Sequence, residues 1–140
     1  MVHQACKIKS NIHAQTSDGM ISLEPKELEE RLGSICFELN VHCCTANQNV
    51  TCQLSDVWVS YSELNAFESQ LLNQEVAQLI DMSGDCVLLI KASSDFTLIE
   101  LNPDIEPLVK ASPSVKVILL TKTSIKDALY QAMRDYPKWW

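Results

Sequence analysis

The chain has 140 residues, of which 46% are apolar and 21% are charged, and this composition excludes a disordered or collagen-like protein. Its three glycines lie far apart, which excludes the clustered glycine loops that hold nucleotide phosphates. Eighteen acidic residues against eleven Lys and Arg give a net charge of -7, so neither nucleic acid nor an anionic membrane is expected to bind directly.

Residues 6–12 are expected to form a first strand, which ends at a polar turn that contains Asp18 and the following glycine. Residues 24–32 are predicted to form a short helix. Pro25 suits the first turn of a helix, and Gly33 suits the position just after its end.

A hairpin is expected next, because residues 35–42 and 50–59 both carry apolar residues at alternate positions. The alternation changes parity midway through the second strand. One extra residue near Ser55 and Asp56 would correct this, so a β-bulge is predicted there. The alternative is a strand with both faces covered, on which Trp58 packs against the second side.

The segment that begins at Ser60 carries the clearest helix signal in the chain. Ser60 and Glu63 match a capping box, in which each side chain accepts a hydrogen bond from a free backbone N–H of the first turn. Val59 and Leu64 flank this box as a hydrophobic staple. The apolar stripe expected along the helix is Leu64, Phe67, Leu71 and Leu72.

A meander of three strands follows at residues 76–82, 86–92 and 96–102, since the linkers between them have the length and composition of hairpin turns. Residues 115–121 are predicted to form a further strand, which is apolar enough to be buried on both faces. Residues 124–136 are expected to form the last helix.

Two tryptophans, Trp139 and Trp140, follow Pro137, which ends the last helix. They are expected either to fold back on the domain or to serve as anchors at an interface. The order of elements predicts an α+β fold in a single domain over residues 1–140. We expect a mostly antiparallel sheet of about six strands with two to three helices packed against it.

The protein is expected to be cytoplasmic, because residues 1–9 lack the apolar run of a signal peptide and no segment reaches the roughly 18 apolar residues of a membrane span. Its six cysteines are then expected to be free thiols. A role is left open for Cys36, Cys43, Cys44 and Cys52.

These four cysteines and His42 form the one cluster of potential metal ligands. Their spacings are those of strands rather than of the short CxxC turns that hold zinc, so no metal and no cofactor are expected. Adjacent side chains on a strand point to opposite faces, which separates His42 from Cys43 as a catalytic pair.

Paired carboxylates can divide acid and base roles in catalysis, but in a chain with eighteen acids such pairs occur by chance. The pairs in question are Asp81 with Asp85 and Asp104 with Glu106. Because both lie in or beside expected turns, we interpret them as solvated residues. The protein is not expected to be an enzyme.

The distribution of charge is more informative, because no Lys or Arg occurs between Leu32 and Ile90. This stretch is either an ordinary soluble surface or a docking surface for a cationic protein. Its acidic residues are Glu38, Asp56, Glu63, Glu68, Glu75, Asp81 and Asp85.

A strand that leads into an ELxxFxxxL helix is the most recognisable segment of the chain. Residues 52–59 read CQLSDVWV and precede a helix that carries Glu63, Phe67 and Leu71. The meander of residues 76–102 follows. This arrangement covers about half of the chain and resembles that of small bacterial immunity proteins, including those of contact-dependent growth inhibition systems.

The resemblance implies a protein that binds and neutralises one cognate toxin domain, often a basic nuclease, by covering it. It would be a monomer or a weak dimer. The acids would steer or contact the toxin, and Trp58 and Tyr61 would be anchors, unless Trp58 is a core residue. The expected partner-binding residues are Glu38, Asp56, Trp58, Tyr61, Glu63, Glu68 and Asp81.

Two other functions stay open. Small acidic α+β proteins of this size also resemble chaperones of bacterial secretion systems, which dimerise and wrap an unfolded segment of an effector in apolar grooves. A small enzyme with a thiol or metal site is the third possibility. The state of the partner separates the first two functions, since an immunity protein binds a folded domain.

Overall fold

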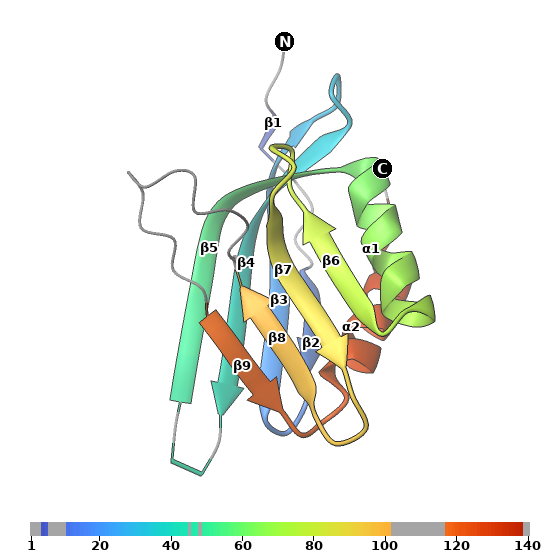
Figure 1. Cartoon of the computed structure of the whole chain (residues 1–140). Coiled ribbons are helices and arrows are strands. Elements are labelled where there is room, and N and C mark those ends of the chain that lie inside the picture. The colour runs from blue at the N-terminus through green and yellow to red at the C-terminus, as the bar shows by residue number, and fades with distance from the viewer. Residues whose placement is uncertain (1–3, 6–10, 45, 48, 102–116, 139–140) are drawn as a thin grey trace, which may run out of the picture.

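Two antiparallel sheets and two helices make up the part of the chain that the computed structural model describes, residues 4–5, 11–44, 46–47, 49–101 and 117–138 (Figure 1). One sheet, sheet A, has five strands, and the other, sheet B, has four. The elements in chain order are β1 (Gln4–Ala5), β2 (Ile12–Gln15), β3 (Gly19–Glu29), β4 (Ser34–Cys44), β5 (Asn49–Ser60), α1 (Tyr61–Asn73), β6 (Val76–Ile80), β7 (Cys86–Ala92), β8 (Thr97–Leu101), β9 (Val117–Thr121) and α2 (Ile125–Asp135).

The α+β class is confirmed, whereas the expected single sheet of about six strands is wrong. Strands β2 to β5 form one meander, with β1 added beside β3, and β6 to β9 form a second meander. Each meander has one strongly apolar face, and together with the helices these faces make a single buried core. Burying two such faces against each other removes more apolar surface from water than one wider sheet would.

The predicted helix over residues 24–32 is also wrong, because β3 extends to Glu29 and pairs with β4. The register shifts between Pro25 and Glu27, so Pro25 lies at a bulge, where a strand tolerates a residue without an N–H. Gly33 has a positive φ of 60° in the tight turn between β3 and β4, rather than at the end of a helix.

The hairpin of β4 and β5 is confirmed, and so is the bulge predicted in it. The register shifts between Phe37 and Leu39, where Ser55 and Asp56 together oppose Glu38. Asp56 has a left-handed φ of 57°, a conformation that aspartate adopts more readily than most residues. Both neighbours of β4 therefore carry one extra residue near Phe37, which bends sheet A around the core.

Helix α1 begins as predicted, with the Ser60 hydroxyl accepting a hydrogen bond from the backbone N–H of Glu63 at 3.2 Å. Of the predicted stripe, Leu64, Phe67 and Leu71 are buried, whereas Leu72 is 57% exposed. Leu72 lies beyond the edge of the stripe because the helix turns 100° per residue and the buried residues already span its inner face.

The three-stranded meander of β6, β7 and β8 is confirmed, and β9 completes sheet B. The expectation that β9 is buried on both faces is wrong. Leu119 and Thr121 are buried, but Ile118 and Leu120 are 51% and 53% exposed. No described element covers the outer face of sheet B, and only the inner face of β9 meets the core (Figure 1).

Helix α2 matches the predicted helix and ends before Pro137. Trp139 and Trp140 lie outside the described residues, as does most of the predicted strand over residues 6–12, of which only the last two residues are described. No helix among the described residues is long and apolar enough to cross a membrane.

The two halves of the fold exchange their helices. Strands β2 to β5 lead into α1, which packs on β6, and strands β6 to β9 lead into α2, which packs on β2. The helices also contact each other, since the buried Lys126 of α2 donates a hydrogen bond to the carbonyl oxygen of Leu71 in α1. Each half therefore covers the first strand of the other's meander.

Asp18, in the turn between β2 and β3, ties this hairpin to the segment between β9 and α2. Its carboxylate accepts hydrogen bonds from the backbone N–H of Lys122 at 2.6 Å and from the hydroxyl groups of Thr16 and Thr123. Burial alone would raise the pKa of Asp18, but these hydrogen bonds outweigh burial and hold the pKa below its ordinary value of 3.8.

Replacing Asp18 by asparagine is expected to lower the free energy of unfolding by about 1–2 kcal/mol near pH 7, because the hydrogen bonds lose a charged acceptor. A depressed folded-state pKa stabilises the fold above 3.8, and this stabilisation is lost as pH falls through the folded pKa. The difference between variant and wild type should therefore narrow below about pH 4. Urea unfolding of both proteins over a pH series measures this difference in the free energy of unfolding. A difference that does not change with pH would contradict the role of the Asp18 carboxylate as a charged acceptor.

Candidate functional site

The outward side chains of β3, β4 and β5 form a strongly acidic surface. The alternation that buries Ile35, Phe37 and Leu39 turns the residues between them away from the core. Register then aligns acids from β3 with those of the next two strands. We call the resulting surface the acidic face. Its accessible carboxylates are Glu24, Glu27, Glu38 and Asp56, whereas Glu29, at the end of the face, is only 6% exposed.

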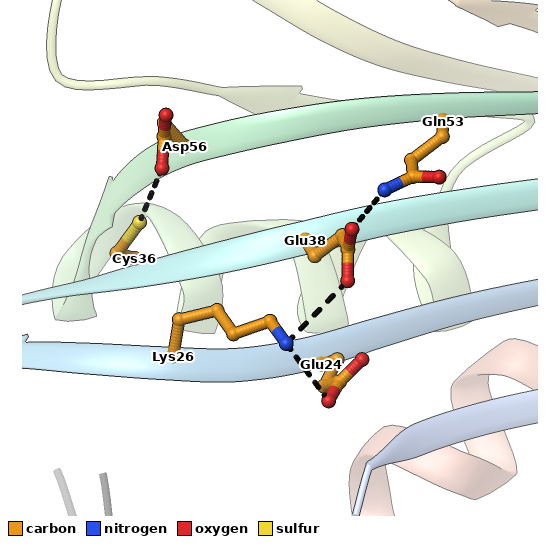
Figure 2. Close-up of polar contacts among 6 residues, drawn as sticks. All are labelled: Glu24, Lys26, Cys36, Glu38, Gln53 and Asp56. Carbon is orange, nitrogen blue, oxygen red and sulfur yellow. Dashed lines mark hydrogen bonds and ion pairs between the residues drawn. The ribbon is translucent and has the colours of Figure 1, made fainter. Parts of the chain in front are cut away.

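Lys26 is the one Lys or Arg on this face among the described residues, and it lies between two of the acids (Figure 2). Its Nζ is 3.0 Å from Glu24 Oε1 and 3.5 Å from Glu38 Oε2. The hydrogen bond with Glu24 raises the pKa of Lys26 above its ordinary value, so Lys26 stays charged. Gln53 donates a hydrogen bond to the other oxygen of Glu38. The centre of the face is thus an ordered polar network.

The bulge places Asp56 over Cys36 at the other end of the network. The Cys36 Sγ lies 4.0 Å from Asp56 Oδ1 (Figure 2). Burial, and then the charges of Asp56 and Glu27, raise the pKa of Cys36 to about 11. The thiol is therefore protonated near neutral pH and is a poor nucleophile.

An apolar hollow of about 340 Å³ lies at the end of the acidic face, and residues of the β3–β4 and β6–β7 turns line it. Trp58 is half-buried here, and its backbone oxygen accepts a hydrogen bond from the Met82 N–H at 2.7 Å. Leu32 and Met82 are 68% and 47% exposed. We call this the Trp58 hollow, and its lining residues are Glu29, Leu32, Ser34, Trp58, Met82 and Ser83.

Two predicted partner-binding residues shape the turns around this hollow. Asp81 Oδ1 accepts hydrogen bonds from the backbone N–H groups of Ser83 and Asp85, both at 2.9 Å, and so fixes the β6–β7 turn. The backbone N–H of Tyr61 donates to the carbonyl oxygen of Gly33 at 2.8 Å, and a Cβ at Gly33 would lie 3.4 Å from the Tyr61 ring.

The structure therefore brings most of the predicted partner-binding residues to one region. Glu38, Asp56 and Trp58 share the acidic face, and Tyr61 and Asp81 lie in the elements that border the Trp58 hollow. Their role in binding stays a prediction.

The two remaining acids lie on α1. Glu63 is half-buried in the first turn, close behind Tyr61. Glu68 lies farther along the helix, where Lys138 Nζ is 2.9 Å from its Oε1. Because this carboxylate already has a cation beside it, Glu68 contributes less to an attractive surface than the sequence predicts.

Sequence reasoning missed the acids that β3 contributes, Glu24, Glu27 and Glu29, because it placed them in a helix. Ile21 and Leu23 do alternate with polar residues, which indicates a strand, but the bulge after Pro25 interrupts this signal. Allowing one extra residue after Pro25, as the β-bulge prediction allows at Ser55 and Asp56, extends the strand signal through these acids.

The cysteine and histidine cluster is spread over both faces of sheet A. His42 points outward, where its Nδ1 lies 2.8 Å from the Thr51 Oγ1. Cys43 points into the core, where burial raises its pKa to about 11. Among the described residues, no group of three or more His, Cys, Asp or Glu could hold a metal ion. The predicted pair of Asp104 and Glu106 lies outside the described residues.

Comparison with protein families, with characterised proteins and with solved structures finds no match to this chain. The acidic face and the Trp58 hollow are the features of this chain that bear on its function.

Proposed function

We propose that this chain is a cytoplasmic bacterial immunity protein that binds a basic toxin domain and neutralises it by occlusion. The observation that carries the proposal is the acidic face, which places four accessible carboxylates and one lysine on three adjacent strands, next to an apolar hollow. The family that the sequence resembles, immunity proteins of contact-dependent growth inhibition systems, acts in this way.

The two parts of the surface would contribute different properties to the complex. The carboxylates create a negative potential that speeds the approach of a cationic protein and orients it. The hollow offers Trp58, Leu32 and Met82 to an apolar side chain of the toxin, and a buried apolar contact of this kind slows dissociation. Neither part requires bond making, so the protein would act by covering the toxin's own site.

The proposal is tested first by co-purifying the chain with the products of neighbouring genes and then by measuring association rates. The variant combines Glu24→Gln, Glu38→Gln and Asp56→Asn, which keep the size of each side chain and, at position 56, suit the left-handed φ. Association with the basic protein should slow about tenfold at low salt, and the difference should vanish near 1 M salt, where the screening length is about 3 Å.

A matched control removes the same number of charges elsewhere, through Glu75→Gln, Asp95→Asn and Asp135→Asn, all at exposed positions. This control should associate within about twofold of wild type, because it leaves the local potential at the face in place. Equal effects of the two triple variants would show that only net charge matters. That result, or a chain that retains no basic protein, would contradict the proposal.

A secretion-chaperone function is the second candidate, and the apolar outer face of sheet B favours it because Ile118 and Leu120 are half-exposed there. The two functions differ in the form of the partner. A chaperone would retain its effector as an unfolded segment, whose amide hydrogens exchange rapidly outside the bound region. An immunity protein would retain a folded domain, whose amides stay protected in the complex.

A further inference from the structure

The outer face of sheet B is an apolar surface that the described elements leave uncovered. Neither helix lies over it, since α1 and α2 pack beside the sheets, against β6 and β2 (Figure 1). Two rows of outward-facing residues cross all four strands of the sheet, and five of the eight residues in these rows are apolar. The first row is Val76, Lys91, Leu98 and Leu120, and the second is Gln78, Leu89, Glu100 and Ile118.

The charge of these two rows suits a second copy of this chain better than the basic partner of the acidic face. The rows carry Lys91 and Glu100 and hence no net charge, on a chain whose net charge is -7. Two copies repel each other wherever their acidic surfaces meet, and this face lets them approach without that repulsion. A basic protein gains no attraction from it.

The pattern at the centre of the face is self-complementary. Lys91 and Leu98 pair in the first row, and Leu89 and Glu100 pair in the second, so the charges occupy one diagonal and the leucines the other. Consider a two-fold axis that lies in the plane of the interface and passes through Leu89 and Leu98. Rotation about this axis places Lys91 of one copy opposite Glu100 of the other. The same axis places each leucine against its own equivalent, as an isologous interface requires.

We propose that two copies of this chain associate through the outer face of sheet B, with their strands crossing at a large angle. Four strands about 4.8 Å apart and about 16 Å long give each copy a flat footprint of roughly 300 Å². The two copies together would bury roughly 600 Å², which is less than the roughly 1,200 Å² of a stable specific interface, so the dimer is weak and forms reversibly. Orthogonal packing of sheets of this kind is a known arrangement.

Sedimentation equilibrium of the full chain from about 1 µM to 1 mM tests the proposal, with an expected dissociation constant on the order of 10–100 µM. Lys91→Glu places like charges opposite each other and should weaken the dimer at least about tenfold. Adding Glu100→Lys restores opposite charges and should bring the dissociation constant back to within about threefold of wild type.

Arg134→Glu, at an exposed position of α2, makes the same change of charge away from the face and should leave the dissociation constant unchanged. Leu98→Gln is a second disrupting variant that needs no charge change, and circular dichroism confirms that each variant is folded. A wild-type chain that stays monomeric at every concentration would overturn the proposal. This holds also if the monomer binds an unfolded segment of another protein on this face. A dimer that resists both Lys91→Glu and Leu98→Gln would also overturn it.

Discussion

Replacing Phe37 by alanine is expected to lower the free energy of unfolding by about 3–5 kcal/mol, which is the largest single effect that the fold predicts. Phe37 is fully buried on the inner face of β4, between Pro25 of β3 and Val57 of β5. Phe37 lies where both neighbouring strands carry their extra residue. The bend of sheet A at this point keeps the neighbouring side chains from moving into the space that the ring leaves. The cavity left by the ring would therefore collapse only in part.

Urea denaturation, followed by circular dichroism, measures this loss as a shift of the midpoint at constant slope. Phe37→Leu keeps most of the apolar volume and should cost less than about 2 kcal/mol. Domains of this kind are stable by about 5–15 kcal/mol, so the alanine variant should remain folded in water yet unfold at much lower urea. If the alanine variant lost less than 1 kcal/mol, the core described for β4 would be wrong.

Trp58→Ala is expected to raise the dissociation rate of the proposed complex with a basic toxin domain about 30-fold, which corresponds to about 2 kcal/mol. The indole is the largest apolar group in the Trp58 hollow, and alanine would remove it while keeping the backbone oxygen that binds Met82. The association rate should change less than about twofold, because no charge is lost. Surface plasmon resonance with the co-purified partner separates the two rates.

Phe96→Ala provides the matched control. Phe96 is 42% exposed in the turn between β7 and β8. This turn lies at the opposite end of sheet B from the β6–β7 turn, which borders the Trp58 hollow (Figure 1). Its loss should leave both rates unchanged. Equal dissociation rates for the Trp58 and Phe96 variants would show that the hollow makes no contact with the co-purified partner, even if the acidic face still steers its approach.

The elements from Ser60 onward were predicted well because their signals are local. A capping box fixes the start of α1, and short polar turns separate β6, β7 and β8, which are strands of five, seven and five residues. Such signals depend on a few neighbouring residues. The exposure of Ile118 and Leu120 could not be predicted in the same way. The four consecutive apolar residues at 117–120 fit either a strand buried on both faces or one with an uncovered face.

The first half was harder to predict because its pattern is broken twice. Pro25 and the bulge after it imitate the start of a helix, and Gly33 fits a helix end as well as it fits a tight turn. The division into two sheets depends on long-range pairing. The alternation of a strand shows which side chains are buried, but it does not show which distant strand covers them.

The candidate site was predicted in part. The acidic stretch led to Glu38 and Asp56, and both lie on the acidic face. A stretch of sequence that contains only acidic charges does not show which basic side chains contact it in the folded chain. Lys26 contacts Glu38, and Lys138 contacts Glu68. The Trp58 hollow could not be predicted either, because it forms between turns that are far apart in the sequence.

The exchange of helices between the two halves affects how this chain can fold during synthesis. Strands β2 to β5 and α1 leave the ribosome first, but the helix that covers β2 begins at Ile125, more than a hundred residues after β2 itself. Until then, Ile12 and Ala14 have no partner helix, and α1 has no β6 to pack on. Neither half can bury its apolar surface alone, so folding should occur as one late, cooperative event rather than half by half.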